Sequence, residues 1–231
     1  MDARLPTKVH CSDPAWKYID PRTSPGVRLS NAISHRAAKL AEFVADDRLD
    51  LASIELARFA HPAVEAEHVL GRLDSLAAEV EGETHLALRR IIGIRHGIGG
   101  NVDDYDNPDN SYLNRVLETR RGIPISLSIL WMEVGRRAGL EMQGVGLPGH
   151  FVVYAAGQLV DPFHYGEAIG FDEAASLIAT AIGGDPRLDQ RWLEPVATAG
   201  IIQRVLRNLE NTYPPDSPEL EWISACQGVL R

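Results

Sequence analysis

The amino-acid sequence predicts an α+β domain, on three observations. Apolar residues recur at helical spacing through the first hundred residues, beginning near Leu29. Between Met142 and Val160 the pattern changes to alternating or continuous apolar residues in runs of strand length. Helical spacing then returns at Asp172. Helices followed by strands and again by helices, with no repeat of fixed period, are typical of an α+β fold.

The first hundred residues are predicted to form a tail and a helical layer. Residues 1–28 contain Pro6, Pro14, Pro21 and Pro25 and little apolar periodicity, so we expect a loosely packed tail there. A first helix follows from Leu29, with its apolar residues on one face. Further helices are expected over residues 51–59, 62–80 and 85–97, the second of these with Pro62 at its first position.

The middle of the chain is predicted to hold a central helix and a small sheet. A turn-rich loop over residues 101–110 leads to a short helix, 111–120. The stronger helix, 124–138, begins with a proline and ends before Gly139. Its apolar residues Leu127, Leu130, Trp131 and Val134 point to one side, which we expect to pack on the sheet. The predicted strands are 142–147, 150–155 and 158–160, and the later helices are 172–182, 200–213 and 218–230.

Composition and charge limit the classes of partner. The 231 residues include 32 acidic and 23 basic side chains, and the formal net charge is −9. A protein that tracks nucleic-acid phosphates needs a basic stripe, so no nucleic-acid partner is expected. Neither a membrane-spanning apolar run nor a signal-peptide core is present in the sequence. Cys11 and Cys226 lack the spacing of a metal site or redox pair, and two scattered thiols suit the cytoplasm.

Two motifs suggest cofactors but fit structural roles better. Residues 144–149 match GxGxxG, yet a dinucleotide fingerprint must open a helix, whereas this segment leads into a predicted strand. The acidic loop 103–109 lacks the spacing, the central glycine and the closing glutamate of a calcium loop. We therefore expect no cofactor and no metal.

His150 and Asp161 form the candidate site. Each lies in or beside a short strand, and one hairpin separates them. Antiparallel neighbours place their side chains about 5 Å apart, so the carboxylate can orient the imidazole as in a nucleophile–His–Asp triad. By themselves these residues also fit structural roles, since a histidine after a turn and an aspartate before a proline are common.

Three sequence blocks resemble the signatures of the bacterial SirB family of transglutaminase-like proteins. The blocks are residues 121–130 (RGIPISLSIL), 145–153 (VGLPGHFVV) and 160–164 (VDPFH). Residues 99–101 and 110–118 resemble upstream segments of the same family, and the likeness covers roughly residues 51–171. The resemblance implies a core of one helix against an antiparallel sheet, with His150 and Asp161 in the histidine and aspartate positions. We therefore expect a proline-rich tail (1–28), a transglutaminase-like domain with its helical layer (29–185), and a C-terminal segment (186–231) that resembles the start of a truncated helical repeat.

The sequence departs from that pattern at the nucleophile. In the superfamily a cysteine opens the central helix, whereas here that position is Pro124. The nearby hydroxyls are Ser126, predicted on the polar face with Glu133 and Arg137, and Ser128, predicted on a stripe of small residues that a sheet could approach closely. The family pattern has a small hydroxyl at the Ser126 position, so Ser126 is the candidate third catalytic residue. For both serines, capping or filling space is the competing interpretation.

Two functional hypotheses follow. The first is a cytoplasmic transglutaminase-like protein without a classical catalytic cysteine, which binds a peptide or protein partner in its cleft without catalysis. The second is a hydrolase or acyl-transferase in which Ser126 acts with His150 and Asp161. A hydroxyl within hydrogen-bond reach of a His150 ring nitrogen would favour the second. A closed cleft, which would leave an interaction protein without this site, is the third possibility.

Overall fold

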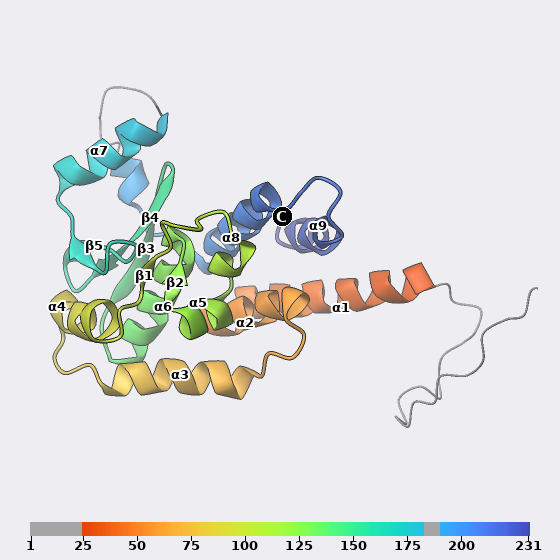
Figure 1. Ribbon diagram of the computed structural model, residues 1–231, viewed down its shortest axis with the longest axis horizontal. Helices are drawn as coiled ribbons and strands as arrows, with labels where there is room; N and C mark the ends of the chain where they lie inside the picture. The colour runs from red at the N-terminus through yellow and green to blue at the C-terminus, as the bar shows by residue number, and fades with distance from the viewer. Residues whose placement is uncertain (1–24, 183–189) are drawn as a thin grey trace, which may run out of the picture.

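A computed structural model of the chain describes residues 25–182 and 190–231 (Figure 1). The predicted tail up to residue 24 and part of the segment around the predicted limit at 185 lie outside the described residues. The α+β class is confirmed: helices surround one small antiparallel sheet. Within the described residues, no helix combines the length and the apolar composition needed to cross a bilayer.

The N-terminal layer contains α1 (Pro25–Ala45), α2 (Leu49–Ala60), α3 (Ala66–Ala78) and α4 (His85–Leu88), which continues into the π-helix η2 (Arg89–Arg95). The first helix begins four residues before Leu29, so the helical layer reaches into the predicted tail. Pro62 does not start α3. It lies in a turn, and the helix begins at Ala66 after Glu65 in extended conformation.

The central helix α6 (Pro124–Arg137) was predicted almost to the residue. Pro124 occupies its first turn, where a missing N–H costs nothing. Gly139, with φ of +81°, lies just past its end, in the left-handed conformation that glycine adopts freely. The short helices η3 (Pro108–Ser111) and α5 (Leu113–Thr119) precede it.

The sheet has the order β3 (Met142–Leu147), β4 (His150–Ala155), β5 (Gln158–Asp161) and β6 (Glu167–Ala168), all antiparallel. The GxGxxG segment forms β3 and the tight turn into β4, where Leu147 pairs with His150. A dinucleotide site is therefore not formed there. A separate parallel pair joins β1 (Gly99–Gly100) to β2 (Arg121–Gly122), and such two-residue strands are too short to show a periodicity in the sequence.

Helix α6 lies between the sheet and the N-terminal helices and is buried around its whole circumference. The sheet approaches it where the small residues stand: a Cβ on Gly135 would lie 2.6 Å from Met142 Sδ. The predicted polar face does not face solvent. Arg137 contacts both Glu133 and Asp50 there, at 2.6 and 2.7 Å, so this face carries an ion-pair network against α2.

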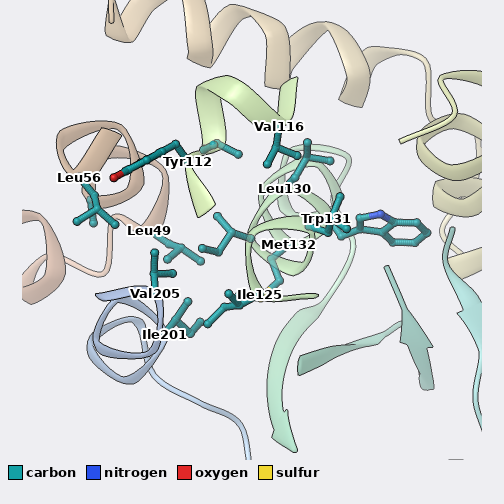
Figure 2. Close-up of a cluster of buried hydrophobic side chains, with 14 of the residues drawn as sticks. Leu49, Leu56, Tyr112, Val116, Ile125, Leu130, Trp131, Met132, Ile201 and Val205 are labelled. Carbon is teal, nitrogen blue, oxygen red and sulfur yellow. The ribbon is translucent and has the colours of Figure 1, made fainter. Parts of the chain in front are cut away.

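The C-terminal part contains α7 (Phe171–Ile182), η4 (Gln190–Leu193), α8 (Thr198–Thr212) and α9 (Glu219–Val229). One buried apolar cluster includes residues of α1, α2, α6, α8 and α9, so the last two helices share the core of the rest. Figure 2 shows this convergence, with Leu49 and Leu56 of α2, Ile125 of α6, and Ile201 and Val205 of α8. The shared core fixes α8 beside the start of α6.

Candidate functional site

His150 and Asp161 are joined by a hydrogen bond across neighbouring strands, as predicted. The distance from His150 Nε2 to Asp161 Oδ2 is 2.8 Å. The register of β4 and β5 pairs Val153 with Val160, and extending it places Asp161 opposite Val152. His150 lies two residues before Val152, and side chains two apart on a strand share one face. The hairpin register therefore brings this pair together.

The Asp161 carboxylate is the buried centre of the site. Its side chain is only 2% exposed, and Oδ2 also receives a hydrogen bond from His164 Nδ1 at 2.8 Å. Oδ1 accepts the Phe163 backbone N–H at 2.9 Å. Burial opposes ionisation, but the hydrogen bonds and charges of His150 and His164 outweigh it, so the pKa of Asp161 is lowered. The group is thus an ionised acceptor at neutral pH.

The ionised carboxylate determines the proton positions on the two rings. Because a carboxylate only accepts hydrogen bonds, the ring nitrogen that faces it must carry a proton. In the neutral imidazole of His150, Nε2 is then the donor, and Nδ1, which forms no hydrogen bond with another described residue, is the basic nitrogen. An orienting carboxylate behind a histidine is the arrangement that a general base needs.

The loop after β5 holds these groups in place by packing on glycines. Gly100 N–H donates to Phe163 O at 2.8 Å, and a Cβ on Gly100 would lie 2.6 Å from the Phe163 ring. A Cβ on Gly99 would likewise lie 2.4 Å from the nearest atom of the Tyr165 ring. The Phe163 ring in turn meets His150 edge-on, with centroids 6.2 Å apart. The glycines of β1 therefore let the loop approach closely enough to position His164 and Phe163.

A cavity of about 340 Å³ opens beside His150. It is bounded by Pro124 and Ile125 at the start of α6, by Gly149 and His150 in and after the β3–β4 turn, and by the polar face of α8. Pro124, at the expected nucleophile position, and His150, the candidate base, thus border the same hollow. A larger hollow of about 560 Å³, along Gln143 and Leu193, includes no charged side chain among the described residues that line it. We take the cavity at His150 as the candidate cleft.

The nearby hydroxyls are engaged elsewhere. Ser126 is buried, accepts the Ile123 N–H at 3.2 Å and donates to Asn110 O at 2.5 Å, so it ties the start of α6 to the preceding loop. Ser128 donates to Phe151 O at 3.3 Å and fills the contact between α6 and β4. Among the described residues, no hydroxyl forms a hydrogen bond with His150. These contacts match the capping and filling roles, and give no support to Ser126 as a nucleophile.

The cysteines differ in what the structure says of them. Cys226, on α9, is fully buried in the shared apolar core. Burial, together with the nearby charge of Glu55, raises the pKa of its thiol to about 12. A reactive thiolate needs the opposite environment. Cys11 lies outside the described residues.

One group of side chains has the composition of a metal site. His150, Asp161 and His164 each offer a ligand atom, and these atoms lie within 4.8 Å of one another. Two imidazoles and a carboxylate are a donor set that zinc accepts. In the structure these atoms are hydrogen-bonded to one another, with Asp161 Oδ2 in the centre. The acidic loop 103–109 contributes no residue to a group of three ligands among the described residues.

Several residues of the cleft were not predicted from the sequence. Tyr105 is positioned by Asn110, whose amide donates to Asp104 O and Tyr105 O. Arg204 and Arg207 come from α8, more than fifty residues after His150. The sequence does indicate that these residues share one helix face, because residues 204, 207, 208 and 211 form a polar stripe at helical spacing opposite apolar residues. The pattern does not predict which part of the protein this polar face lies against.

Comparison with known proteins agrees with this architecture. The family model described as the transglutaminase-like superfamily matches residues 63–207, which include α6, the sheet and most of α8. No solved structure matches the chain significantly.

Two UPF0162 proteins match about three quarters of the chain, and an F-box protein matches a shorter part of it. A UPF0162 protein of Xylella fastidiosa is 38% identical over 189 residues, which cover 74% of this chain and 67% of that protein. A UPF0162 protein of Pseudomonas aeruginosa is 28% identical over 179 residues, covering 73% and 66%. F-box only protein 21 of Mus musculus is 34% identical over 97 residues, which are 39% of this chain and 16% of that protein. The chain spans about two thirds of the length of the UPF0162 proteins above.

Proposed function

Because this chain belongs to the transglutaminase-like superfamily, we propose that it is a non-catalytic module that binds a peptide in the cleft at His150. The proposal is supported by an open cavity that is bordered by His150 and by Pro124, the residue at the expected nucleophile position. Pro124 and His150 border one hollow of about 340 Å³, and proline has no group that could attack a substrate.

The cleft has the composition of a binding site. Its volume falls within the ordinary range for ligand pockets, roughly 300–1,000 Å³. Tyr105 and Phe151 supply aromatic surface, while Asn208, Asn211 and two arginines supply hydrogen-bond donors. Asn208 and Asn211 form no side-chain hydrogen bond with other described residues, so their amides are free to pair with peptide groups.

The intact His150–Asp161 pair favours one alternative, a hydrolase or acyl-transferase. An ionised carboxylate behind a histidine whose Nδ1 has no hydrogen-bond partner among the described residues is the base half of a triad. The missing half is a nucleophile, since Ser126 is occupied at the start of α6 and Cys226 is buried with a raised pKa. The serine hypothesis requires Ser126 to leave Asn110 O, and a thiol mechanism requires Cys11.

Two narrower assignments belong to this proposal. Membership in the SirB family is supported by blocks 121–130, 145–153 and 160–164, which form the start of α6, the β3–β4 hairpin and the loop after β5. A cytoplasmic location is supported by the two widely spaced thiols.

Peptide binding is tested by selection from a displayed library of random peptides on the immobilised full chain. In Asn208→Trp a large side chain on α8 fills the cleft. The control, Glu67→Trp, introduces the same side chain at an exposed position of α3. We expect selected peptides to bind wild type and the α3 variant and to lose binding to Asn208→Trp. Peptides that bind all three proteins equally would place binding elsewhere and refute the proposal.

Catalysis is tested separately with electrophiles directed at serine and cysteine. We expect labelling of purified protein to be the same in wild type and in His150→Ala. Labelling that disappears in His150→Ala, in a variant that still melts cooperatively, would show an activated nucleophile. Mapping that label to Ser126 or Cys11 would then decide between the two catalytic alternatives.

A further inference from the structure

The polar face of α8 carries two arginines without a carboxylate partner at the mouth of the cleft. Many arginines of the described chain, such as Arg36 and Arg115, form ion pairs with acidic side chains. Arg204 and Arg207 form none with any described residue, although the chain as a whole has a net charge of −9. Unpaired cations grouped in one hollow of an acidic protein point to an anionic ligand.

Arg204 is the fixed member of the pair. Its Nη2 donates to Leu147 O at 2.6 Å and to His150 O at 2.7 Å, and its guanidinium lies over the Phe151 ring, 5.4 Å from the centroid. These contacts fix the guanidinium against the β3–β4 turn, while Nε and Nη1 have no hydrogen-bond partner among the described residues. Two donors of a rigid, half-buried cation are thus left over beside His150.

Arg207 is the exposed member. It lies one turn along α8 and has no hydrogen bond or ion pair with another described residue. Burial and the like charge of Arg207 lower the pKa of Arg204, although Tyr105 acts in the opposite direction, and no carboxylate of the described residues is among the causes. Asp106, in the loop that carries Tyr105, forms no ion pair with either arginine. An anion between the two guanidinium groups would relieve their repulsion.

The opposite wall of the cleft also suits an anion. Ile125 lies in the first turn of α6, and its backbone N–H forms no hydrogen bond with another described residue. The first N–H groups of a helix have no partner within it and carry partial positive charge. Asn208 and Asn211 add amide donors on the arginine side. Residues with an unpaired donor therefore border the hollow from α6 and from α8.

We propose that the cleft recognises a carboxylate group of its peptide ligand, held between Arg204 and Arg207 beside His150. The planar fork of arginine matches a carboxylate with two parallel hydrogen bonds. The carboxylate is either an acidic side chain or the C-terminus of the peptide. This inference rests on the proposed peptide binding, to which it adds the chemical class of the ligand.

The test uses the ¹⁵N-labelled full chain, with binding followed by the backbone amide signals of Gly149, His150 and Asn208. The probes are an amidated alanine pentapeptide with a central glutamate, the same peptide with a central glutamine, an alanine pentapeptide with a free C-terminal carboxylate, free glutarate and inorganic phosphate. We expect a carboxylate-bearing peptide to bind at least about ten-fold more tightly than the glutamine peptide, as for a charge-assisted hydrogen bond. Comparison of the glutamate and free-carboxylate peptides identifies the source of the group.

The variants are Arg207→Glu and, as the matched change of charge, Arg90→Glu. Arg207 forms no hydrogen bond or ion pair with another described residue. Arg90, on η2, forms an exposed ion pair with Glu81 and is not among the residues that line the cleft. We expect Arg207→Glu to weaken carboxylate binding by at least about ten-fold and Arg90→Glu to leave it unchanged. Arg204 is not chosen because it also supports the β3–β4 turn.

Each other outcome refutes a defined part of the inference. Equal binding of the glutamate, glutamine and free-carboxylate peptides, unaffected by Arg207→Glu, would leave peptide binding intact and exclude the carboxylate. Binding of glutarate without any peptide would keep the anion site and exclude the peptide function. Stronger binding of phosphate than of every carboxylate would reassign the site to phosphate, and no shift with any probe would refute both proposals.

Discussion

Two histidines donate to the same oxygen of Asp161, and we predict that they contribute very unequally to stability. The His150 side chain is 12% exposed and the His164 side chain 56%, while both ring nitrogens lie 2.8 Å from Asp161 Oδ2. Geometry is thus matched and burial differs. Water competes for and screens the exposed contact much more than the buried one.

The magnitudes follow from burial. A buried hydrogen bond to a charged group contributes about 1.5–3 kcal/mol, so we expect a coupling free energy of that size between His150 and Asp161. For His164, whose side chain is largely in water, we expect about 0.2–1 kcal/mol. His150→Ala leaves Asp161 Oδ2 with its His164 partner, so the expected loss is at the lower end of the first range.

The assay is a pair of double-mutant cycles by urea denaturation at neutral pH. One cycle combines His150→Ala with Asp161→Ala, and the other combines His164→Ala with the same aspartate variant. The Phe163 N–H loses its acceptor in both cycles, so that effect cancels. Equal couplings, or a larger coupling for His164, would refute the argument that burial decides the strength of these two contacts.

Four further outcomes are expected. The free energy of unfolding should fall from about pH 5 downward, because Asp161 stabilises the fold fully only above the pKa of its unfolded state, and this contribution is lost as the pH drops through its lowered folded-state pKa. Asp161→Asn should make that fall shallower when urea denaturation is measured at a series of pH values. Ser126→Ala should lower stability by about 1–3 kcal/mol by removing a buried hydrogen bond at the start of α6, yet bind the library-selected peptides as wild type does. Gly166→Ala should unfold at markedly lower urea, since its Cβ would lie 1.9 Å from Trp131 at a φ of +76°; a normal midpoint would show that the loop can move. Cys226 should react with iodoacetamide in the native protein only as fast as the protein unfolds. If a Cys11→Ala, Cys226→Ala double variant still melts cooperatively but no longer binds peptide, a cysteine takes part in the function.

Local pattern was sufficient for the elements that place the dyad. Proline at the start of α6 and glycine after its end marked that helix, and period-two runs marked β3 and β4 at the residues observed. Because one hairpin joins β4 to β5, the meeting of His150 with Asp161 also followed from the sequence. All of these features depend on residues within a few positions of one another or within one hairpin.

The surroundings of the dyad depend on contacts between distant segments. The helical phase of Ser126 placed it on a polar face, but the structure shows that Asn110 lies against that part of the face and takes its hydroxyl. Arg204 was visible as part of an amphipathic helix, and only folding placed its guanidinium on the carbonyl of His150, 54 residues earlier.

The sequence alone therefore determined the class of fold, the central helix and the histidine–aspartate pair. The tertiary structure decided which hydroxyls are occupied, which cations remain unpaired and that Pro124 and Arg207 face one cavity with His150. Periodicity reports which face of an element is apolar, because each residue's exposure follows from its own helix or strand. It carries no information on which other element covers a polar face, since that is set by long-range packing of the whole core.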